Sequence, residues 1–335
     1  MKNIVVLVAD ALRYDAVPGR VRDEFRSGVI PTLAPSLHTP TSFASLFTAR
    51  SPQHHNVRDF LQDLDPDIPT AFDQFDNTAF YDGPDSTLDR HIFRSGGADL
   101  DAMEPPFCWI ERLMETHIPY GEMGHDREFE WEMPGSEYRE KGMRGDFDLQ
   151  AAYRDGVAKL EDHVFRHIEE LDDRGLLDDT LVVLTSDHGE LFGERYMFRQ
   201  RFEHNYPPLR PLVEVPTAFY NADVDTDCMR GIDVLPTAFS IVGKEPFGDG
   251  VDVRTRSVSA GANVMNDPKA RFRTRWRFRD GHWRPTGRSR VHRAVKTVSG
   301  DIKQAVYRRG YRPLEERVEE LASEGGEDEI AGVDV

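Results

Sequence analysis

The chain has 335 residues, a length that suits one large α/β domain with a small appendage. Its 60 acidic residues outnumber its 42 basic residues, and the resulting net charge of −18 disfavours nucleic acid as a main partner, because both would be negatively charged. The two cysteines, Cys108 and Cys228, are too few for a disulfide framework and lack a metal-binding spacing. We therefore expect reduced thiols in an intracellular protein.

Residues 4–9 form an unbroken apolar run, which is typical of a strand buried on both faces of a parallel sheet. The run is too short for a signal peptide or a membrane span, so we expect a cytoplasmic protein with no transmembrane segment. Asp10 follows the run directly. Ligands of open α/β sheets bind at the carboxyl ends of the strands, which makes this aspartate a candidate site residue.

Two further segments indicate the same edge of the sheet. Residues 39–50 have the pattern of a loop entering a helix, with Thr39 near the helix N-terminus. Residues 107–114 are a second apolar segment that leads into the sequence THIPY. Pro119 ends regular structure there and leaves His117 at the carboxyl edge.

The clearest helix is predicted over residues 152–171, where apolar side chains recur at spacings of three and four and Gly175 provides a C-cap. An apolar strand over residues 181–184 follows and leads into Asp187 and His188. This alternation predicts an α/β fold with a doubly wound, mostly parallel sheet and helices on both faces.

The remaining segments are predicted to be peripheral. Residues 121–148 are polar and without a usable period, which indicates a surface loop overhanging the site. Over residues 271–279 arginine alternates with Phe, Thr and Trp before an Asp-Gly turn, which predicts an antiparallel hairpin. We divide the chain into a catalytic domain, a small antiparallel C-terminal subdomain and an acidic, disordered tail. Their ranges are 1–250, 251–313 and 314–335.

Five side chains are expected at the ligand edge: Asp10, Thr39, Asp187, His188 and His204. Such an oxygen-rich set suits one divalent cation, namely Mn²⁺, Mg²⁺ or Ca²⁺, with Zn²⁺ as an alternative because of the histidines. A threonine hydroxyl that binds a cation at a helix N-terminus loses its proton more readily and becomes a better nucleophile.

Several blocks resemble the sulfatase branch of the alkaline phosphatase superfamily, in the order found in that family. VADALRYD is similar to its first metal block, HTPTSFASLFTARSPQHHNV to its nucleophile block and TSDHGE to its second metal block. METHIPY, HNYPPLRPLVEVP and GIDVLPTAFSIVG resemble later segments of the family. The resemblance covers roughly residues 1–245 and implies an alkaline phosphatase-like fold.

The resemblance also implies roles for single residues. It makes Asp10, Asp187 and His188 ligands of the metal, and Thr39 both a ligand and the nucleophile. His117 and His204 become contacts to the ester oxygens, and either would be able to protonate the leaving group. Arg13 matches the arginine that follows the first acidic residue, and we interpret its role as only structural.

The departures from the sulfatase pattern narrow the chemistry. Thr39 stands where sulfatases have a cysteine or serine that is converted to an aldehyde, and threonine cannot form that aldehyde. Phe43 replaces the arginine of the signature, and Ala11 replaces a second aspartate. The two-zinc phosphodiesterases have a histidine four residues after an aspartate, and this sequence contains no such pair. We therefore expect one metal ion and favour phosphodiester, phosphonate ester or phosphoglycerol chemistry over that of aldehyde-dependent sulfatases.

Other conspicuous residues are interpreted as structural. His54 and His55 lie in a segment that is mainly structural in the family. His163 and His167 are four residues apart on the long helix, beside charged residues, and we expect them at the surface. The arginines of residues 271–279 form a solvated strand face, or alternatively a site for an anionic glycan or lipid headgroup.

The sequence thus predicts a metal-dependent hydrolase or transferase that acts on sulfate or phosphate esters through a covalent intermediate on Thr39. Its partner would be a small-molecule, glycan or lipid ester. The alternative is a degenerate sulfatase-like protein that binds an anionic glycan or lipid headgroup without catalysis.

Overall fold

The structure is a computed structural model of residues 1–335, in which most of the chain is described. The residues outside the description are 84–85, 122–134, 197–198, 205–206, 259–262, 268–271, 287–289, 297–302 and 309–335. The predicted tail, residues 314–335, therefore lies outside the described residues.

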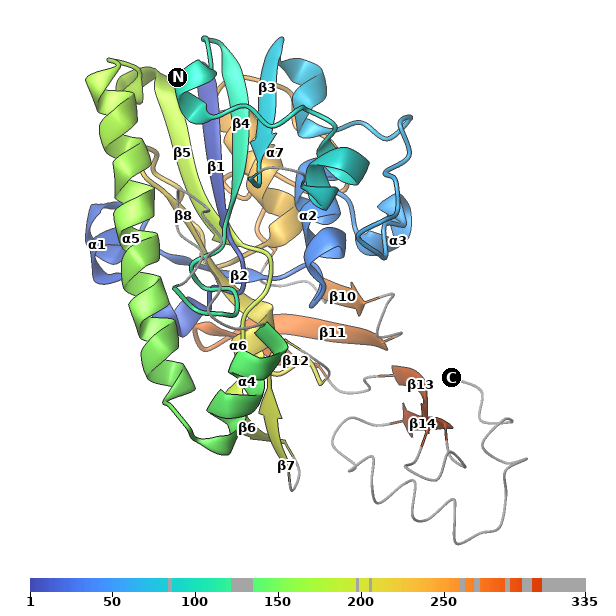
Figure 1. Cartoon of the computed structure of the whole chain (residues 1–335). Coiled ribbons are helices and arrows are strands. Elements are labelled where there is room, and N and C mark those ends of the chain that lie inside the picture. Colours follow the sequence, from blue (N-terminus) through green and yellow to red (C-terminus); the bar gives the residue numbers. More distant parts are fainter. Residues whose placement is uncertain are drawn as a thin grey trace, which may run out of the picture.

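A seven-stranded sheet forms the centre of the molecule, with the strand order β3-β4-β1-β5-β8-β2-β9 (Figure 1). Every strand runs in the same direction except β8, which pairs antiparallel with both β5 and β2. The prediction of a mostly parallel sheet is confirmed. The strands are β1 (Asn3–Ala9), β2 (Ile30–Leu33), β3 (Asn77–Tyr81), β4 (Phe107–Leu113), β5 (Thr180–Ser186), β8 (Glu214–Phe219) and β9 (Met229–Arg230).

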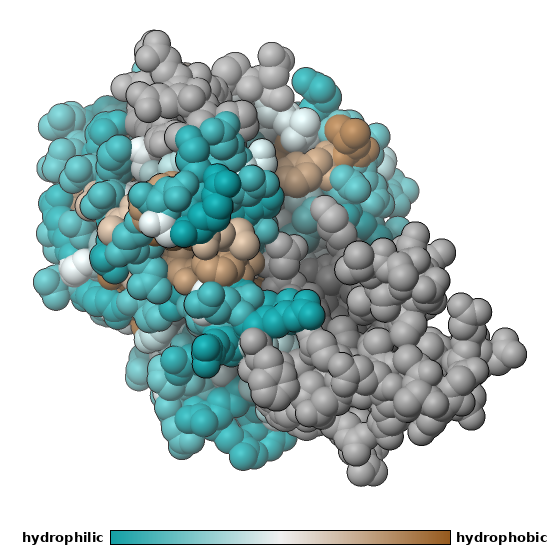
Figure 2. Space-filling model, turned by 60° about the horizontal axis from the view of Figure 1, so that its bottom comes forward, coloured by the Kyte–Doolittle hydropathy of each residue, from teal (hydrophilic) through white to brown (hydrophobic). Residues whose placement is uncertain are grey.

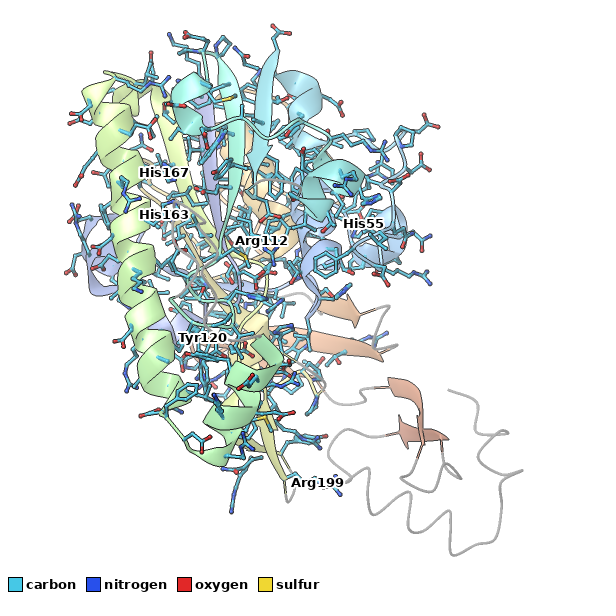
Figure 3. All side chains as sticks on the ribbon, viewed as in Figure 1. His55, Arg112, Tyr120, His163, His167 and Arg199 are labelled. Atoms are coloured by element: carbon cyan, nitrogen blue, oxygen red, sulfur yellow. The ribbon has the colours of Figure 1, made fainter. Side chains whose placement is uncertain are left out.

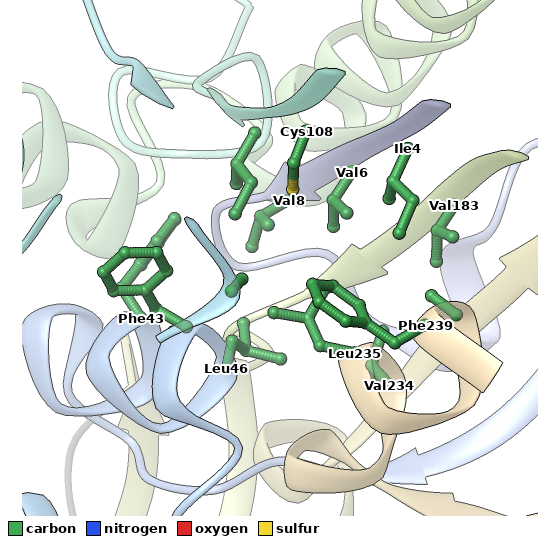
Figure 4. Packing of buried hydrophobic residues seen from close by; sticks show 14 of the residues in the cluster. Ile4, Val6, Val8, Phe43, Leu46, Cys108, Val183, Val234, Leu235 and Phe239 are labelled. Atoms are coloured by element: carbon green, nitrogen blue, oxygen red, sulfur yellow. The ribbon is translucent and has the colours of Figure 1, made fainter. Parts of the chain in front are cut away.

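Apolar side chains on both faces of the strands explain why helices cover both faces of the sheet. In β1, Ile4, Val6 and Val8 pack in the cluster that includes α2 and α7 (Figure 4), whereas the alternate residues pack beneath α5. The helices are α1 (Gly19–Glu24), α2 (Thr39–Thr48), α3 (Pro52–His55), α4 (Gly135–Arg144), α5 (Leu149–Asp173), α6 (Arg210–Val213) and α7 (Val234–Ile241).

Helix α5 begins at an Asp148 cap, whose carboxylate accepts hydrogen bonds from two backbone N–H groups, and it contains the predicted helix. His163 and His167 are buried on this helix, with 2% and 3% of their surfaces exposed. The prediction that they lie at the surface is wrong. They follow Leu160 and Val164 by three residues, so the helical repeat puts them on the same stripe that faces the sheet.

Residues 121–148 are not one loop, because α4 occupies residues 135–144 of this segment. Little in the amino-acid pattern predicts this helix, because the side chain that it buries is that of Tyr138. The Arg139 guanidinium forms an ion pair of 2.6 Å with Glu203, directly after β7 (Arg199–Phe202). This helix is therefore joined to the loop that carries His204.

The predicted hairpin is confirmed, since β11 (Phe272–Arg279) pairs antiparallel with β12 (His282–Pro285) across Asp280 and Gly281. Its tryptophans, Trp276 and Trp283, are buried in a cluster with residues of β2 and β8, whereas Arg279 is exposed. The hairpin belongs to a five-stranded antiparallel sheet, and β6 (Phe192–Tyr196) forms a separate ribbon with β7. The other strands of the larger sheet are β10 (Asn263–Asp267), β13 (Arg290–Lys296) and β14 (Lys303–Arg308).

The surface in view in Figure 2 is mainly hydrophilic where its residues are described, in keeping with the acidic composition. Within the described ranges, no helix combines the length and the apolarity that crossing a bilayer would require.

Candidate active site

The parallel register of β1 and β5 brings two carboxylates to the same level of the sheet. Ala9 pairs with Ser186 at the ends of the two strands, and Asp10 and Asp187 are the residues that follow them. Hydrogen bonds then join the two loops: the Ala11 N–H donates to Asp187 Oδ1 at 3.1 Å, and the Leu12 N–H donates to Ser186 Oγ at 3.0 Å. The two acidic groups are therefore fixed by the backbone that surrounds them.

The structure brings together four residues that the sequence assigned to one site. One ligand atom each from Asp10, Asp187 and His188 lies within 4.8 Å of the other two. Thr39 Oγ1, on the first residue of α2, is 3.3 Å from His188 Nε2. The same nitrogen is 3.4 Å from Asp187 Oδ2.

The donor set fits a divalent cation. Asp10 Oδ1 and Asp187 Oδ2 are buried and have no hydrogen-bond partner among the described residues. Such groups are costly to bury unless something compensates their charge. Burial, together with the negative charge of Asp10, raises the pKa of Asp187 well above its ordinary value. A cation between the two carboxylates would remove this cost, and the buried oxygens and the histidine nitrogen are suitable ligands.

His188 has the tautomer that a ligand needs. Its Nδ1 lies 3.0 Å from the Gly189 carbonyl oxygen, to which an N–H there donates, so the lone pair of Nε2 faces Thr39. Burial lowers the pKa of His188 to about 4, helped by the nearby His204, so the ring is neutral at pH 7. A Cβ at Gly189 would overlap the Pro211 carbonyl oxygen, which explains the glycine after this histidine.

The two other predicted histidines flank this set. The His204 ring stacks on that of His188 with 4.2 Å between ring centroids. Burial opposes protonation of His204, yet Glu190, whose Oε2 is 3.8 Å from His204 Nδ1, raises its pKa to about 9. Burial lowers the pKa of His117, although the charge of Asp10 opposes this effect. His204 is therefore the protonated member of the pair at neutral pH.

Arg112 is a site residue that the sequence interpretation missed. Its Nε and Nη2 donate to Asp10 Oδ2 at 2.9 and 2.6 Å. Burial opposes ionisation of Asp10, yet Arg112, with His117 and His188, holds its pKa below the usual range. Phe43, which replaces the signature arginine, is buried against Phe80 and contributes to the core instead. The sequence signal that would have identified Arg112 is the charged pair Glu111 and Arg112 within the otherwise apolar strand β4.

Glu190, the last residue of TSDHGE, was also given no role. Its carboxylate accepts a hydrogen bond of 3.3 Å from the Tyr120 hydroxyl and faces His204. Arg13 forms ion pairs with Asp15 at 2.7 Å and with Glu194 at 2.6 Å, which holds the loop after β1.

His54 and His55 lie outside this set. His54 Nδ1 is 2.5 Å from an Asp249 carboxylate oxygen, and the buried His55 contacts Ser45 Oγ at 2.8 Å. Both histidines hold neighbouring segments together.

Comparison with known proteins finds sulfatase-like relatives. The sulfatase family model matches residues 66–210. The chain is 29% identical over 286 residues to the low-salt glycan biosynthesis sulfotransferase Agl7 of Haloferax volcanii, covering 81% of this chain and 68% of that protein. It is also 29% identical over 155 residues to the multifunctional alkaline phosphatase superfamily protein PehA of Trinickia caryophylli, a match that covers 45% of this chain and 28% of PehA.

Solved structures share the fold at low sequence identity. A 2-O GAG sulfatase has a TM-score of 0.57 and 14% identity, over 97% of this chain and 90% of its own. The lipoteichoic acid synthase LtaP of Listeria monocytogenes has a TM-score of 0.53 and 12% identity, covering 95% and 89%. For the phosphonate monoester hydrolase of Agrobacterium radiobacter the values are 0.52 and 14%, covering 99% and 93%. In sequence and fold the chain thus resembles sulfatase-like proteins of the alkaline phosphatase superfamily.

Proposed function

We propose that the protein is a metal-dependent hydrolase or transferase of sulfate or phosphate esters, in which Thr39 forms a covalent intermediate. One observation carries the proposal: Thr39 Oγ1 lies 3.3 Å from His188 Nε2, next to two buried carboxylates with uncompensated oxygens. Asp10, Asp187, His188 and Thr39 would hold one divalent cation, for which Mn²⁺, Mg²⁺ and Ca²⁺ are the first candidates and Zn²⁺ the alternative.

The side chains divide the work of an in-line displacement. Thr39 Oγ1 gives up its proton to solvent and forms the new bond to sulfur or phosphorus, while the ester oxygen leaves from the opposite side; water or an acceptor hydroxyl then takes the group and the threonine oxygen regains a proton. The protonated His204 is suited to donate the proton that the leaving oxygen needs, while Glu190 keeps that imidazole charged. His117 would contact the substrate oxygens. When bound, the cation supplies positive charge that favours ionisation of the hydroxyl and offsets charge on the substrate.

The glycan sulfotransferase relative supports a glycan as the substrate or acceptor, and its name favours transfer of a sulfuryl group. Thr39 opposes the aldehyde route of the sulfatases, because threonine lacks the required β-methylene chemistry. Phosphodiesters and phosphonate esters therefore belong in the same test as sulfate esters.

The test compares wild type with Thr39→Ala on aryl sulfate, aryl phosphodiester and aryl phosphonate monoester substrates in the presence of Mn²⁺. We expect kcat to fall by a factor of about 10³ or more on the preferred substrate, as for other nucleophile deletions. Thr48→Ala is the matched control, because Thr48 is at the other end of α2 and its hydroxyl bonds the Ala44 carbonyl. Undiminished turnover by Thr39→Ala would refute the role of the hydroxyl.

A second measurement separates hydrolysis from transfer. With a sulfate or phosphate donor present, a sulfated or phosphorylated oligosaccharide product identifies a transferase, whereas release of the free anion alone identifies a hydrolase. Both reactions share the intermediate on Thr39, so rapid quenching of the wild-type enzyme should trap the modified threonine for mass spectrometry.

The alternative function, binding without catalysis, has one observation in its favour. Arg277 and Arg279 line an open groove, and they would bind an anionic glycan or lipid headgroup there, although Asp227 and Asp280 line the same groove and oppose an anion. We propose catalysis rather than binding alone, because a protein that binds an anion at its surface would not require the buried carboxylates of Asp10 and Asp187. A chain that binds dextran sulfate but neither divalent metal nor an ester substrate would favour the alternative.

A further inference from the structure

We infer that α5 and β4 form a second metal site, separate from the catalytic one, in which Glu111, His163 and His167 bind a zinc-like divalent ion. One ligand atom from each of these residues lies within 4.8 Å of the other two. The site uses neither Asp10 nor Thr39 and does not depend on the proposed function.

The pattern of each element brings the ligands together. Glu111 lies in β4, where Phe107, Trp109 and Leu113 alternate with it and pack in the cluster beneath α5. His163 and His167 are one turn apart on the buried stripe of α5. Figure 3 shows both histidines beside α5, on its side toward the sheet. A glutamate from the strand therefore meets two imidazoles from the helix.

The same nitrogen of each imidazole faces Glu111. His163 Nε2 is 3.6 Å from Glu111 Oε1, and His167 Nε2 is 2.7 Å from Glu111 Oε2. Neighbouring ligands of a tetrahedral zinc ion are roughly 3.3 Å apart, given zinc–ligand bonds near 2.0 Å. The 3.6 Å separation at His163 is close to this value, whereas the 2.7 Å contact at His167 would have to lengthen by roughly 0.6 Å. A ligand set of two histidine nitrogens and one carboxylate favours zinc over calcium or magnesium, which prefer oxygen ligands.

The outer nitrogens of the two rings also face carboxylates. His163 Nδ1 is 2.6 Å from Glu115 Oε1, and His167 Nδ1 is 3.7 Å from Glu170 Oε2. A histidine ligand of a metal commonly donates its second N–H to a carboxylate, which fixes the tautomer and directs the other nitrogen to the ion. His163 shows this relation through its hydrogen bond to Glu115, whereas the 3.7 Å separation of His167 from Glu170 is an ion-pair distance only.

The surroundings favour an ion over solvent. Glu111, Glu115, His163 and His167 are 0%, 1%, 2% and 3% exposed, so their charges must be compensated inside the protein. Glu115 Oε2 is buried without a hydrogen-bond partner among the described residues. Close packing holds the two elements, because a Cβ at Gly156 of α5 would overlap the carbonyl oxygen of Glu115.

The experiment uses full-length Asp10→Asn, Asp187→Asn protein, in which the catalytic carboxylates no longer bind metal. After chelation and desalting, this parent is titrated with Zn²⁺ and with Co²⁺. We expect one equivalent of Zn²⁺ to remain bound through a further desalting step, as measured by mass spectrometry of the metal. The Co²⁺ form should show the visible absorption bands of a low-symmetry, nitrogen-ligated ion.

Substitutions in the same parent then identify the site. His163→Gln, His167→Gln should lose the bound equivalent, whereas His54→Gln, which changes an exposed histidine with one carboxylate partner, should keep it. Glu115→Gln should weaken Zn²⁺ binding by about 10- to 100-fold, as expected for a group that orients a ligand.

A parent protein that binds no Zn²⁺ at micromolar concentration would overturn the inference and leave a buried network of ion pairs. This result needs no substitution in α5, and it is decisive once circular dichroism shows that the parent is folded, because Asp10→Asn removes one partner of the buried Arg112 ion pair. Retention of the metal by the His163→Gln, His167→Gln variant would equally overturn it.

Discussion

Replacement of Arg112 by methionine tests the electrostatics of the site, since the change removes the charge that Asp10 depends on. The Asp10 side chain is fully buried, and 11% of the Arg112 side chain is exposed. Two hydrogen bonds to Asp10 Oδ2 would be lost, leaving two neighbouring carboxylates without a fixed positive charge. Removing one partner of a buried ion pair destabilises a protein by about 3–5 kcal/mol.

We expect this loss in the free energy of unfolding when chelator is present, and a smaller loss at saturating Mn²⁺, because a cation would take over part of the compensation of Asp10. The matched control is Arg26→Met. Arg26 forms an ion pair of 2.9 Å with Asp223, but the two side chains are 61% and 71% exposed. Exposed pairs contribute about 0.2–1 kcal/mol.

Urea unfolding followed by circular dichroism, with and without Mn²⁺, measures both effects. A cost of Arg112→Met in chelator no larger than that of Arg26→Met would refute the reasoning, since the pair would then contribute no more than an exposed one. An equal cost with and without Mn²⁺ would show that the cation does not compensate Asp10. Arg112→Lys should lie between wild type and methionine, because lysine keeps the charge but not the paired hydrogen bonds.

Three further predictions use other parts of the structure. Burial lowers the pKa of His55 from 6.5 to about 3, so the folded state favours the neutral ring. The stability that the neutral ring contributes is complete above pH 6.5 and is lost as the pH falls. Between pH 7 and pH 5, the free energy of unfolding of wild type should therefore fall by about 2 kcal/mol more than that of His55→Gln, as measured by urea unfolding. Gly189→Ala should lower kcat/KM roughly a hundredfold by displacing His188, whereas Gly19→Ala, with open space around it, should not. Removing metal with chelator should lower the thermal midpoint, and readdition of Mn²⁺ should raise it less in Asp187→Asn than in wild type.

The sheet and the site set could be predicted because their signals are local. Residues 4–9 and 181–184 are apolar throughout; Asp10 follows the first run directly and Asp187 follows the second after two residues. Parallel pairing in the observed register, with Ala9 beside Ser186, brings the two aspartates level. The predicted helix that begins near Thr39 is confirmed, whereas the choice of Thr39 as nucleophile comes from the resemblance of its block to the sulfatase family. The roles of these residues stay predictions, as do the domain boundaries.

The features that the sequence did not predict depend on contacts between segments that lie far apart in the chain. Helix α4 has a weak apolar pattern and is tied to the body by Arg139, an ion pair that no local pattern encodes. His163 and His167 were assigned to the surface because charged residues flank them, although the three-residue spacing from Leu160 and Val164 indicated the buried stripe. Arg112 faces Asp10 only through the order of the strands, which the sequence does not state.

The end of β4 connects the two clusters of the protein. Glu111 and Glu115 contact the α5 histidines, while Arg112 and Thr116 contact Asp10, the latter through a hydrogen bond of 2.6 Å to its carbonyl oxygen. Successive residues of a strand face opposite sides, so one short segment can serve both. The position of the Arg112 guanidinium therefore depends on how firmly the preceding glutamate is held, and a metal ion beneath α5 would fix the strand end that supports the Asp10 carboxylate.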